Sequence, residues 1–474
     1  MTDQTPNLLF IMADDHAGYV LGCDGNALAE TPNLDRLAKD GVRLASHYCN
    51  SPVCSPSRQS ILTGKLPHAA SVTVNSSALD VDTPTIASSL LAAGYETAAM
   101  GVMHFNKPAA PGLHGFATVA TEDVIRSEWS ALPYRQPSPE IAVKPPWKPF
   151  RDPSRIWLNA DALPYPRYAG DMEDDYLVRR ASCFLEQHAA TPFALWVSFH
   201  EPHSPYDFPI EDAGAFDPAL FPTPEVGPDD ADQIPLIFRD VTPAEKQGIT
   251  AAYYTSVRYM DRKIGELLDK LDELGIANNT LVVYLPDHGY CLGHHGRFEK
   301  HCCFEQAIRV PCILRWPKRL APGVVTAPTE SVDIAPTLLD LLGAAPLPGA
   351  QGMSLVQGDG LASTHQYTFT EYTGNEEACI RTPRWKLIHC SGRRARADGY
   401  ITANPTPGRS VRLFNLVDDP GEMHSVAVNR PEIVAELSGL LLARLRSTHP
   451  DATAEPEGLD IGGAIDWYLC PRDI

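Results

Sequence analysis

The sequence has few basic residues for its length. Its 474 residues include 39 Lys and Arg against 59 Asp and Glu, which gives a formal net charge of -20. Nucleic acids and anionic membrane surfaces are bound mainly through clustered Lys and Arg. The composition therefore argues against both classes of partner. An anionic small molecule would need positive charge concentrated locally, as basic side chains or a metal ion, so a metal site is favoured.

The sequence also lacks a long apolar run and a basic N-terminal segment. The apolar residues that begin at Asn7 are interrupted by Asp14 and Asp15, so neither a transmembrane span nor a signal peptide is predicted. The eleven cysteines are spread without the spacing of a zinc ribbon or knuckle. Scattered cysteines in odd number are typical of reduced thiols. We therefore expect a cytoplasmic protein.

Short, continuously apolar segments alternate with helical segments along most of the chain. The apolar segments at 7–12, 193–199 and 280–285 are typical of strands buried in a parallel sheet. Further strands are predicted at 42–48, 96–100 and 310–316, and helices near 31–38, 83–91, 175–188, 243–274 and 331–342. The pattern predicts an α/β fold with a large, mostly parallel sheet flanked by helices.

The texture of the sequence changes after about residue 360. Short alternating segments at 367–372, 377–381 and 384–390 predict an antiparallel sheet, and an amphipathic helix is predicted at about 431–447. We therefore predict a catalytic domain at 1–360 and a smaller C-terminal α+β subdomain at 361–474. The tail from 450 to 474 either folds back on the core or reaches a neighbouring subunit, which leaves a homo-oligomer open.

Residues 121–170 differ from the rest of the predicted catalytic domain. They are rich in proline and contain Trp129, Trp147 and Trp157. We interpret them as a long excursion on the substrate side whose aromatic surface could line a substrate entrance. Ordinary packing is the alternative role for each tryptophan.

Chemically reactive side chains follow four of the predicted strands. They are Asp14 and Asp15, His104, His203, and Asp287 with His288. Open α/β sheets bind ligands at the carboxyl ends of their strands, and adjacent buried carboxylates need a positive partner. Each residue alone has an ordinary explanation, as a buried core histidine or part of a turn. Together they indicate one site.

The stretch Cys54-Ser55-Pro56-Ser57-Arg58 lies at a predicted junction between a loop and a helix. Unpaired N–H groups and the helix dipole favour a nucleophile, and also an anion, at such a position. The alternative is a half-buried cysteine that precedes an ordinary helix.

With these segments considered together, the chain resembles the formylglycine-dependent sulfatases of the alkaline phosphatase superfamily. The resemblance covers most of residues 5–345 and lies in the stretches 7–15, 54–64, 94–104, 198–205, 287–311 and 331–342. It implies that a formylglycine-generating maturation enzyme, which reads a segment containing Ser57 and Arg58, oxidises Cys54 to formylglycine. The hydrate of this aldehyde would be the nucleophile.

The resemblance also implies the remaining parts of the site. One divalent cation would be held by Asp14, Asp15, residue 54, Asp287 and His288. Arg58 would stabilise the nucleophile, and His104 would act as the general base that releases sulfate from residue 54. His203 and Lys300 would bind the transferring group and assist the leaving oxygen. Asn75 aligns with a residue of the substrate pocket.

Two positions depart from the family pattern. Val102 stands where most sulfatases have a lysine two residues before the histidine, and Lys107 is a candidate to compensate. His288 stands where many have asparagine; because imidazole is a softer ligand than an amide oxygen, Mn²⁺ becomes a candidate beside the expected Ca²⁺.

Both departures are shared with a sister family, the phosphonate monoester hydrolases and phosphodiesterases, whereas His104 favours a sulfatase. The predicted function is hydrolysis of a sulfate ester of a small alcohol, phenol or sugar. Hydrolysis of a phosphonate monoester or phosphodiester is the alternative, and a metal-binding pseudoenzyme, suggested by Val102 alone, is a remote one.

Overall fold

The computed structural model describes residues 5–146, 153–230, 233–393 and 409–472. Within them, eight strands form one large sheet in the order β5-β4-β6-β1-β7-β8-β2-β9. The bounds are β1 Asn7–Met12, β2 Val42–Leu44, β4 Glu96–Gly101, β5 Thr118–Thr121, β6 Phe193–Ser198, β7 Thr280–Tyr284, β8 Ile313–Arg315 and β9 Gly323–Val325. The five strands from β5 to β7 are parallel, and only β8 runs against its neighbours. The predicted fold class is confirmed.

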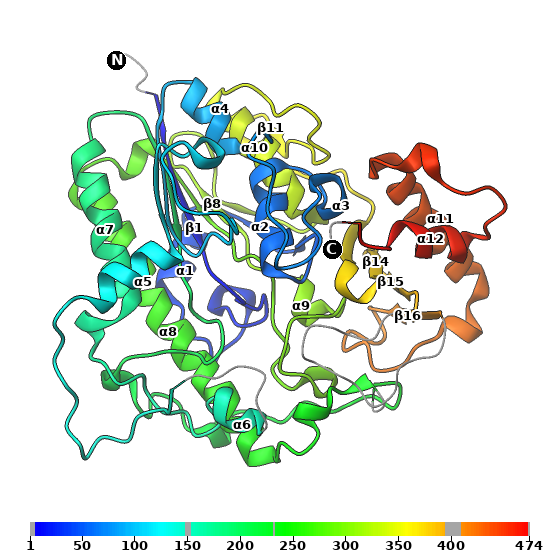
Figure 1. Ribbon diagram of the computed structural model, residues 1–474, viewed down its shortest axis with the longest axis horizontal. Coiled ribbons are helices and arrows are strands. Elements are labelled where there is room, and N and C mark those ends of the chain that lie inside the picture. The colour runs from blue at the N-terminus through cyan, green and yellow to red at the C-terminus, as the bar shows by residue number, and fades with distance from the viewer. Residues whose placement is uncertain (1–4, 147–152, 231–232, 394–408, 473–474) are drawn as a thin grey trace.

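Helices cover both faces of this sheet (Figure 1). The side chains of Leu8, Phe10 and Met12 pack with helices α2 (Cys54–Thr63), α4 (Ile86–Ala92) and α10 (Ile334–Leu342). The alternate residues Leu9 and Ile11 pack with α1 (Pro32–Lys39), α7 (Glu173–His188) and α8 (Pro243–Glu273). Successive side chains of a strand point to opposite faces, so β1, which is buried throughout, contributes to both cores.

The strand predicted at 42–48 is wrong as a single element. Residues 42–44 form β2 in the main sheet, whereas β3 (His47–Tyr48) pairs with β10 (Thr329–Glu330) in a separate two-stranded sheet. The chain leaves the main sheet after Leu44 because its next hydrogen-bonding partner is β10. This change of direction leads the chain to the start of α2.

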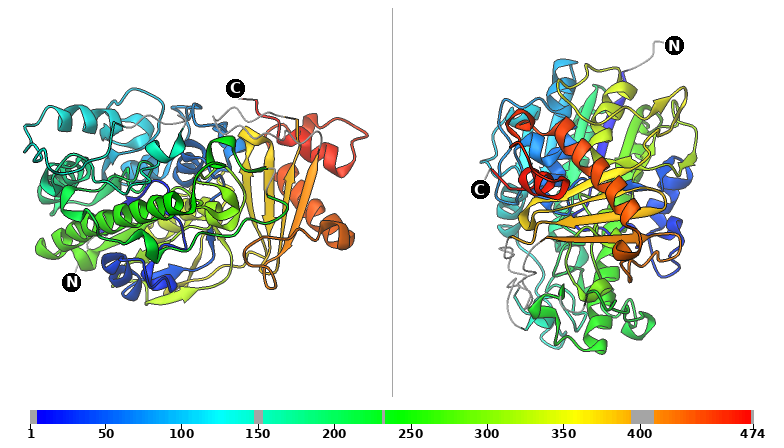
Figure 2. Two further views of the ribbon diagram at one scale, coloured as in Figure 1. Left: turned by 90° about the horizontal axis from the view of Figure 1, so that it is seen from below. Right: turned by 90° about the vertical axis from the view of Figure 1, so that its right-hand side faces the viewer.

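The C-terminal part forms the predicted antiparallel sheet (Figure 2). Its strands are adjacent in chain order: β13 Thr368–Tyr372, β14 Glu377–Arg381, β15 Trp385–Cys390 and β16 Ser410–Asn415. The predicted helix is α11 (Pro431–Thr448), and it packs on this sheet together with a helix that the sequence pattern did not reveal, α12 (Ile461–Tyr468). The domain boundary near residue 360 stays a prediction.

The tail folds back on the chain's own C-terminal sheet. Ile465 of α12 is fully buried in the same apolar cluster as the sheet, and Asp466 contacts Nε2 of His389 at 2.7 Å. Of the two alternatives for the tail, the described residues take the first. Among these residues, no helix combines the length and the apolar character needed to cross a membrane.

The tryptophans of the 121–170 excursion pack internally where the structure describes them. Trp129 lies in α5 (Glu122–Ser130), is 7% exposed, and donates its indole N–H to the carbonyl of Asp171 at 2.7 Å. The guanidinium of Arg167 lies 4.2 Å from the centre of the Trp129 ring. Trp157 is buried in an apolar cluster, and Trp147 lies outside the described residues. The aromatic entrance therefore has no support from Trp129 or Trp157.

Replacing Gly101 by alanine should destabilise the protein far more than replacing Gly94. The two glycines have nearly the same backbone angle, with φ of 93° and 90°, so both variants carry the strain of a left-handed residue. A Cβ at 101 would lie 2.0 Å from the carbonyl oxygen of Ser198, whereas at 94 it would meet no described atom within 4 Å. We expect a loss of about 1–2 kcal/mol for Gly94→Ala and of about 3 kcal/mol or more for Gly101→Ala, measured by urea unfolding. Equal losses would show that β4 can move away from β6.

Candidate active site

Cys54 is the first residue of α2, at the junction that the sequence predicts. Val53 precedes it in an extended conformation, and every residue of the helix is buried. The N–H of Ser55 donates to Oδ1 of Asn75 at 3.1 Å, so the Asn75 side chain caps one of the unpaired donors of the first turn. Asn75 itself is exposed. Asn75 therefore lies next to α2, where its side chain holds the first turn of the helix.

Arg58 lies one turn further along α2 and contacts the ends of several strands. Its Nε donates to Oδ2 of Asp287 at 2.9 Å, and its Nη2 lies 3.3 Å from Oδ2 of Asp14. Its Nη1 donates to Oγ of Ser198 at 2.7 Å and to the carbonyl of Val102. These residues belong to or follow β1, β4, β6 and β7, so one guanidinium joins four parallel strands to the helix.

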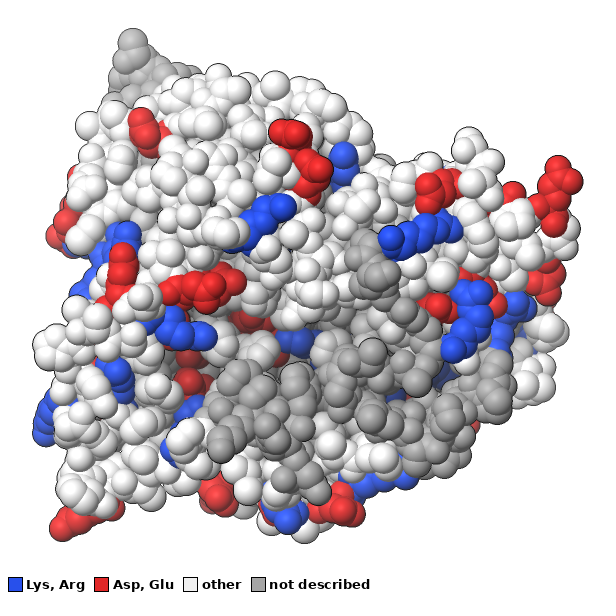
Figure 3. All heavy atoms as spheres, in the orientation of Figure 1, with Lys and Arg blue, Asp and Glu red and all other residues white. Residues whose placement is uncertain are grey.

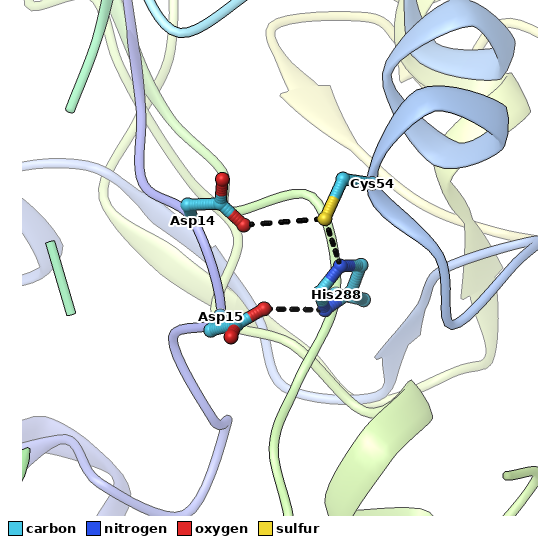
Figure 4. A group of neighbouring side chains, drawn as sticks. All are labelled: Asp14, Asp15, Cys54 and His288. Carbon is cyan, nitrogen blue, oxygen red and sulfur yellow. Dashed lines mark hydrogen bonds and ion pairs between the residues drawn. The ribbon is translucent and has the colours of Figure 1, made fainter. Parts of the chain in front are cut away.

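Four potential metal ligands meet beside Cys54 (Figure 4). One ligand atom from each of Asp14, Asp15, Cys54 and His288 lies within 4.8 Å of the others, and all four side chains are buried. The Sγ of Cys54 lies 3.5 Å from Oδ1 of Asp14 and 3.3 Å from Nε2 of His288. The Nδ1 of His288 lies 3.3 Å from Oδ1 of Asp15. Four of the five predicted ligands are thus brought together.

Asp287, the fifth predicted ligand, faces Arg58. Its Oδ1 accepts the N–H groups of Asp15 at 3.1 Å and of His288 at 2.9 Å, and its Oδ2 accepts Nε of Arg58. Oδ2 also lies 3.6 Å from Nε2 of His288. Asp287 therefore borders the cluster while it orders the two chain segments that supply the other ligands.

Lys300 and His203 reach the same cluster from two loops. The ammonium of Lys300 lies 2.7 Å from Oδ1 of Asp15 and 3.1 Å from Sγ of Cys54. Nε2 of His203 lies 3.8 Å from Oδ2 of Asp15, and its Nδ1 contacts the carbonyl of Ser204 at 2.7 Å. The structure thus places both predicted residues where they can meet a group attached to residue 54.

His104 is held in a left-handed conformation, with φ of 47°. Its carbonyl accepts Nε2 of Gln59 at 3.2 Å, and the preceding N–H, of Met103, donates to Glu122 at 3.0 Å. Its Nδ1 is buried without a hydrogen-bond partner in the described part of the chain. Burial, followed by the charge of Arg58, lowers its pKa to about 3, so the imidazole is neutral at neutral pH.

Two family models match the sequence of this chain. A model described as Sulfatase matches residues 6–344, and one described as N-sulphoglucosamine sulphohydrolase, C-terminal, matches residues 293–448. The chain belongs to the sulfatase family. The predicted resemblance is confirmed, and the protein is a hydrolase of the sulfatase class.

Individual relatives extend the match over nearly the whole sulfatase. A choline-sulfatase of Rhizobium meliloti (strain 1021) is 31% identical over 493 residues, which cover 99% of this chain and 91% of the relative. Two solved structures of phosphonate monoester hydrolases share the fold. The one from Agrobacterium radiobacter has a TM-score of 0.77 and 23% identity and covers 96% of this chain and 98% of that chain. The one from Silicibacter pomeroyi has a TM-score of 0.76 and 25% identity and covers 94% of this chain and 96% of that chain.

Residues that act on this site through backbone or hydroxyl contacts were missed from the sequence. Ser198 binds Arg58, and Gln59 binds the backbone at His104. His200 lies with its ring 5.0 Å from that of His203. Ser198 and His200 lie at or just beyond the end of β6, so the strand-end rule that found His203 could have found them. Gln59 had no such signal.

The donor set of the sulfatase fits a hard or borderline divalent cation. Three ionised carboxylates, Asp14, Asp15 and Asp287, exceed the two cations Arg58 and Lys300 by one charge. Oδ2 of Asp15 is buried without a hydrogen-bond partner among the described residues. Carboxylate oxygens suit Ca²⁺, and the imidazole of His288 also suits Mn²⁺. Residues Asp14, Asp15, Asp287, His288 and residue 54 would hold this cation.

The pKa values of Asp14, Asp15 and Asp287 reflect the excess of carboxylates over cations in the site. Burial, with Asp14 as a neighbour, raises the pKa of Asp287 to about 8, and burial raises the pKa of Asp15 to about 7 although Lys300 opposes it. Burial also opposes ionisation of Asp14, but Arg58, His203 and Lys300 outweigh it and hold its pKa well below the usual value. Without a cation, the site therefore retains protons near neutral pH.

Removing the divalent cation should make the stability of the sulfatase fall as the pH rises from about 6.5 to about 8. In this window the folded protein loses protons from Asp15 and Asp287, which the unfolded chain has already lost near pH 4. The folded state thus binds more protons, and the free energy of unfolding decreases with pH. The neutral histidines of the site, whose folded pKa values are lowered, act in the opposite sense only below about pH 6.5.

Urea unfolding at several pH values, in EDTA and in saturating Ca²⁺ or Mn²⁺, measures this effect. The cation should stabilise the protein by about 2.7 kcal/mol at a hundredfold excess over its Kd and should make the decrease of stability with pH smaller. Asp15→Asn, which cannot ionise at 15, should show a smaller slope in EDTA. Identical slopes with and without cation would contradict the site.

Proposed function

We propose that this sulfatase hydrolyses a sulfate ester of a small alcohol, phenol or sugar through a formylglycine made from Cys54. One observation carries the proposal: Cys54 begins a buried helix with Asp14, His288 and Lys300 all within 3.5 Å of its Sγ. Carboxylate, imidazole and ammonium groups thus converge on the single atom that the family modifies.

The unmodified thiol is poorly suited to be the nucleophile. Burial, followed by the charge of Asp14, raises the pKa of the Cys54 thiol well above its usual value, and a neutral thiol reacts slowly. The hydrate of the aldehyde made from residue 54 would offer a hydroxyl in place of the sulfur, and a divalent cation would ease the ionisation of that hydroxyl. The proposal therefore requires a maturation enzyme in the cell that makes the protein.

The chain's own residues can bind the sulfate group and transfer its protons. Arg58 keeps its charge, because Asp287 and Asp14 raise its pKa against the effect of burial, and so it balances negative charge beside residue 54. Neutral His104 accepts the proton that must leave residue 54 when sulfate is released. Lys300, whose pKa the acids Asp15 and Asp14 raise although burial opposes them, has a proton to give to the departing alkoxide. A divalent cation, Ca²⁺ or Mn²⁺, would polarise the sulfate oxygens and ease ionisation of the hydroxyl on residue 54.

A small leaving group is favoured over a polymer. A choline-sulfatase, whose name denotes a small alcohol, matches this chain with more than nine-tenths of both chains covered. We extend this to a cytoplasmic enzyme that acts on imported sulfate esters. Association into a homo-oligomer also stays a prediction.

Phosphonate monoester or phosphodiester hydrolysis is the second candidate. It is favoured by His288 and by Val102, which is buried and offers Arg58 only its carbonyl. The 25% identity with the phosphonate monoester hydrolase of Silicibacter pomeroyi supports it over 94% of the chain. Lys107 is the candidate to replace the lysine absent at 102. Its charge affects His114: burial and the charge of Lys107 together lower the pKa of His114 to about 4.

Mass spectrometry of the peptide that contains residue 54 should show formylglycine when the protein is made in a host with the maturation enzyme. Cys54→Ala should lower kcat for an aryl sulfate by about 10³-fold or more, because no hydroxyl can form on alanine. Its melting temperature should change little, which serves as the control for folding. Full activity of a preparation in which residue 54 is entirely cysteine would end the proposal.

Rates on an aryl sulfate and on an aryl phosphonate monoester with the same leaving group should separate the two candidates. We expect kcat/KM for the sulfate to be higher by about tenfold or more, equivalent to about 1.4 kcal/mol of transition-state binding. Both rates should be measured on one preparation of known formylglycine content. A higher value for the phosphonate would assign the protein to the second candidate.

A further inference from the structure

The loop that carries Lys300 is attached to the C-terminal antiparallel sheet. The N–H of Cys303 donates to Oε1 of Glu377 at 3.0 Å. Glu377 is the first residue of β14 and is 4% exposed. We propose that Glu377 is a positioning residue for Lys300, so that the C-terminal sheet is a working part of the catalytic centre. This inference rests on the proposed function, in which Lys300 assists the leaving oxygen.

The connection from Glu377 to Lys300 is short and stiff. The N–H of Cys302 donates to the carbonyl of Lys300 at 2.6 Å, so residues 300–302 form a tight turn, and Cys303 follows it directly. On the other side, the N–H of Cys291 donates to the carbonyl of Glu299 at 2.9 Å. The backbone of Lys300 is thus fixed from both directions, and Glu377 supplies the fixed point on the side of the C-terminal sheet.

Further contacts join the same loop to the sheet. The ring of His301 lies 5.7 Å from that of Tyr372 in β13, and Oε1 of Glu305 lies 3.3 Å from Nζ of Lys386 in β15. The loop residues between them pack in one buried cluster with residues of the sheet: Cys302, Cys303 and Phe304 with Cys379, Ile388 and Phe414. The loop therefore follows the sheet along residues 301–305.

The carboxylate of Glu377 is well suited to hold a backbone donor. Its second oxygen accepts the Nδ2 of Asn375 at 3.2 Å, which fixes the plane of the group. A hydrogen bond from an N–H to a buried carboxylate is about twice as strong as one between neutral groups. Lysine has a flexible side chain, so the place of its ammonium beside Asp15 and residue 54 depends on where its backbone is held.

Replacing Glu377 by alanine should lower kcat for an aryl sulfate by about 10- to 100-fold, because a displacement near 1 Å of a catalytic group has an effect of this size. KM should change less than kcat. Glu377→Gln, whose amide oxygen can still accept the N–H of Cys303, should recover most of the rate. Glu376→Gln is the matched control, because Glu376 contacts Arg393 and Ser391 of its own subdomain. If Glu377→Gln and Glu377→Ala are equally slow, the hydrogen bond to Cys303 is not what matters, and the proposal fails.

A double-mutant cycle with Lys300→Ala separates positioning from general damage. If Glu377 acts through Lys300, then Glu377→Ala should have almost no further effect on kcat in the Lys300→Ala background. In the Lys300 background, its effect should be larger for phenyl sulfate than for 4-nitrophenyl sulfate, since the poorer leaving group depends more on protonation. Losses that multiply independently would overturn the inference and leave the proposed function intact. A Lys300→Ala variant with undiminished kcat would instead overturn the role of Lys300 on which both depend.

Discussion

The buried guanidinium of Arg58 is the interaction on which the arrangement of this site depends. It contacts Asp14, Ser198, Asp287 and the carbonyl of Val102, which belong to or follow four neighbouring strands of the sheet. Removing one partner of a buried ion pair is strongly unfavourable, because it leaves a charge without compensation. A shift of helix α2 along the sheet would break these buried ion pairs and would therefore be strongly unfavourable. Cys54 lies four residues before Arg58, on the same face of the helix, and this fixes its Sγ above Asp14 and His288.

The local excess of acid explains how an acidic protein can handle an anionic substrate. The whole chain carries a net charge of -20, and Lys and Arg are scattered among Asp and Glu on the face shown in Figure 3. The net charge of the protein therefore does not attract an anion over long distances, and salt screens interactions between exposed charges at such distances. The site instead gathers Arg58, Lys300 and the ligands of a divalent cation within a buried volume, where charges interact strongly. With its three carboxylates ionised the site has one net negative charge, and a bound divalent cation would give it one net positive charge.

Those parts of the site could be predicted from the sequence in which a recognisable strand is followed directly by reactive side chains. Strands β1, β6 and β7 are continuously apolar, and reactive side chains stand directly after them, so Asp14, His203 and Asp287 could be placed at one sheet edge. The break between β2 and β3 could not be predicted, because it depends on pairing with β10, about 280 residues away. Gln59 and Glu377 were equally hidden. Both act on backbone groups of distant loops, and such contacts leave no pattern in the sequence around them.

The same dependence on backbone contacts gives the C-terminal sheet its significance. Besides the Lys300 loop, it holds the segment that leads into α2: Nδ2 of Asn50 donates to the carbonyl of Phe369 at 2.9 Å, and the N–H of Glu371 donates to the carbonyl of Asn50 at 3.0 Å. Asn50 lies four residues before Cys54. The proposed nucleophile and the proposed acid therefore reach the site from segments nearly 250 residues apart, and both segments contact the C-terminal sheet. Because catalytic groups that act on one substrate must keep their separation within a fraction of an ångström, a common support is a more effective constraint than two independent ones. This is a physical reason why the large sheet and the C-terminal antiparallel sheet belong to one folded unit.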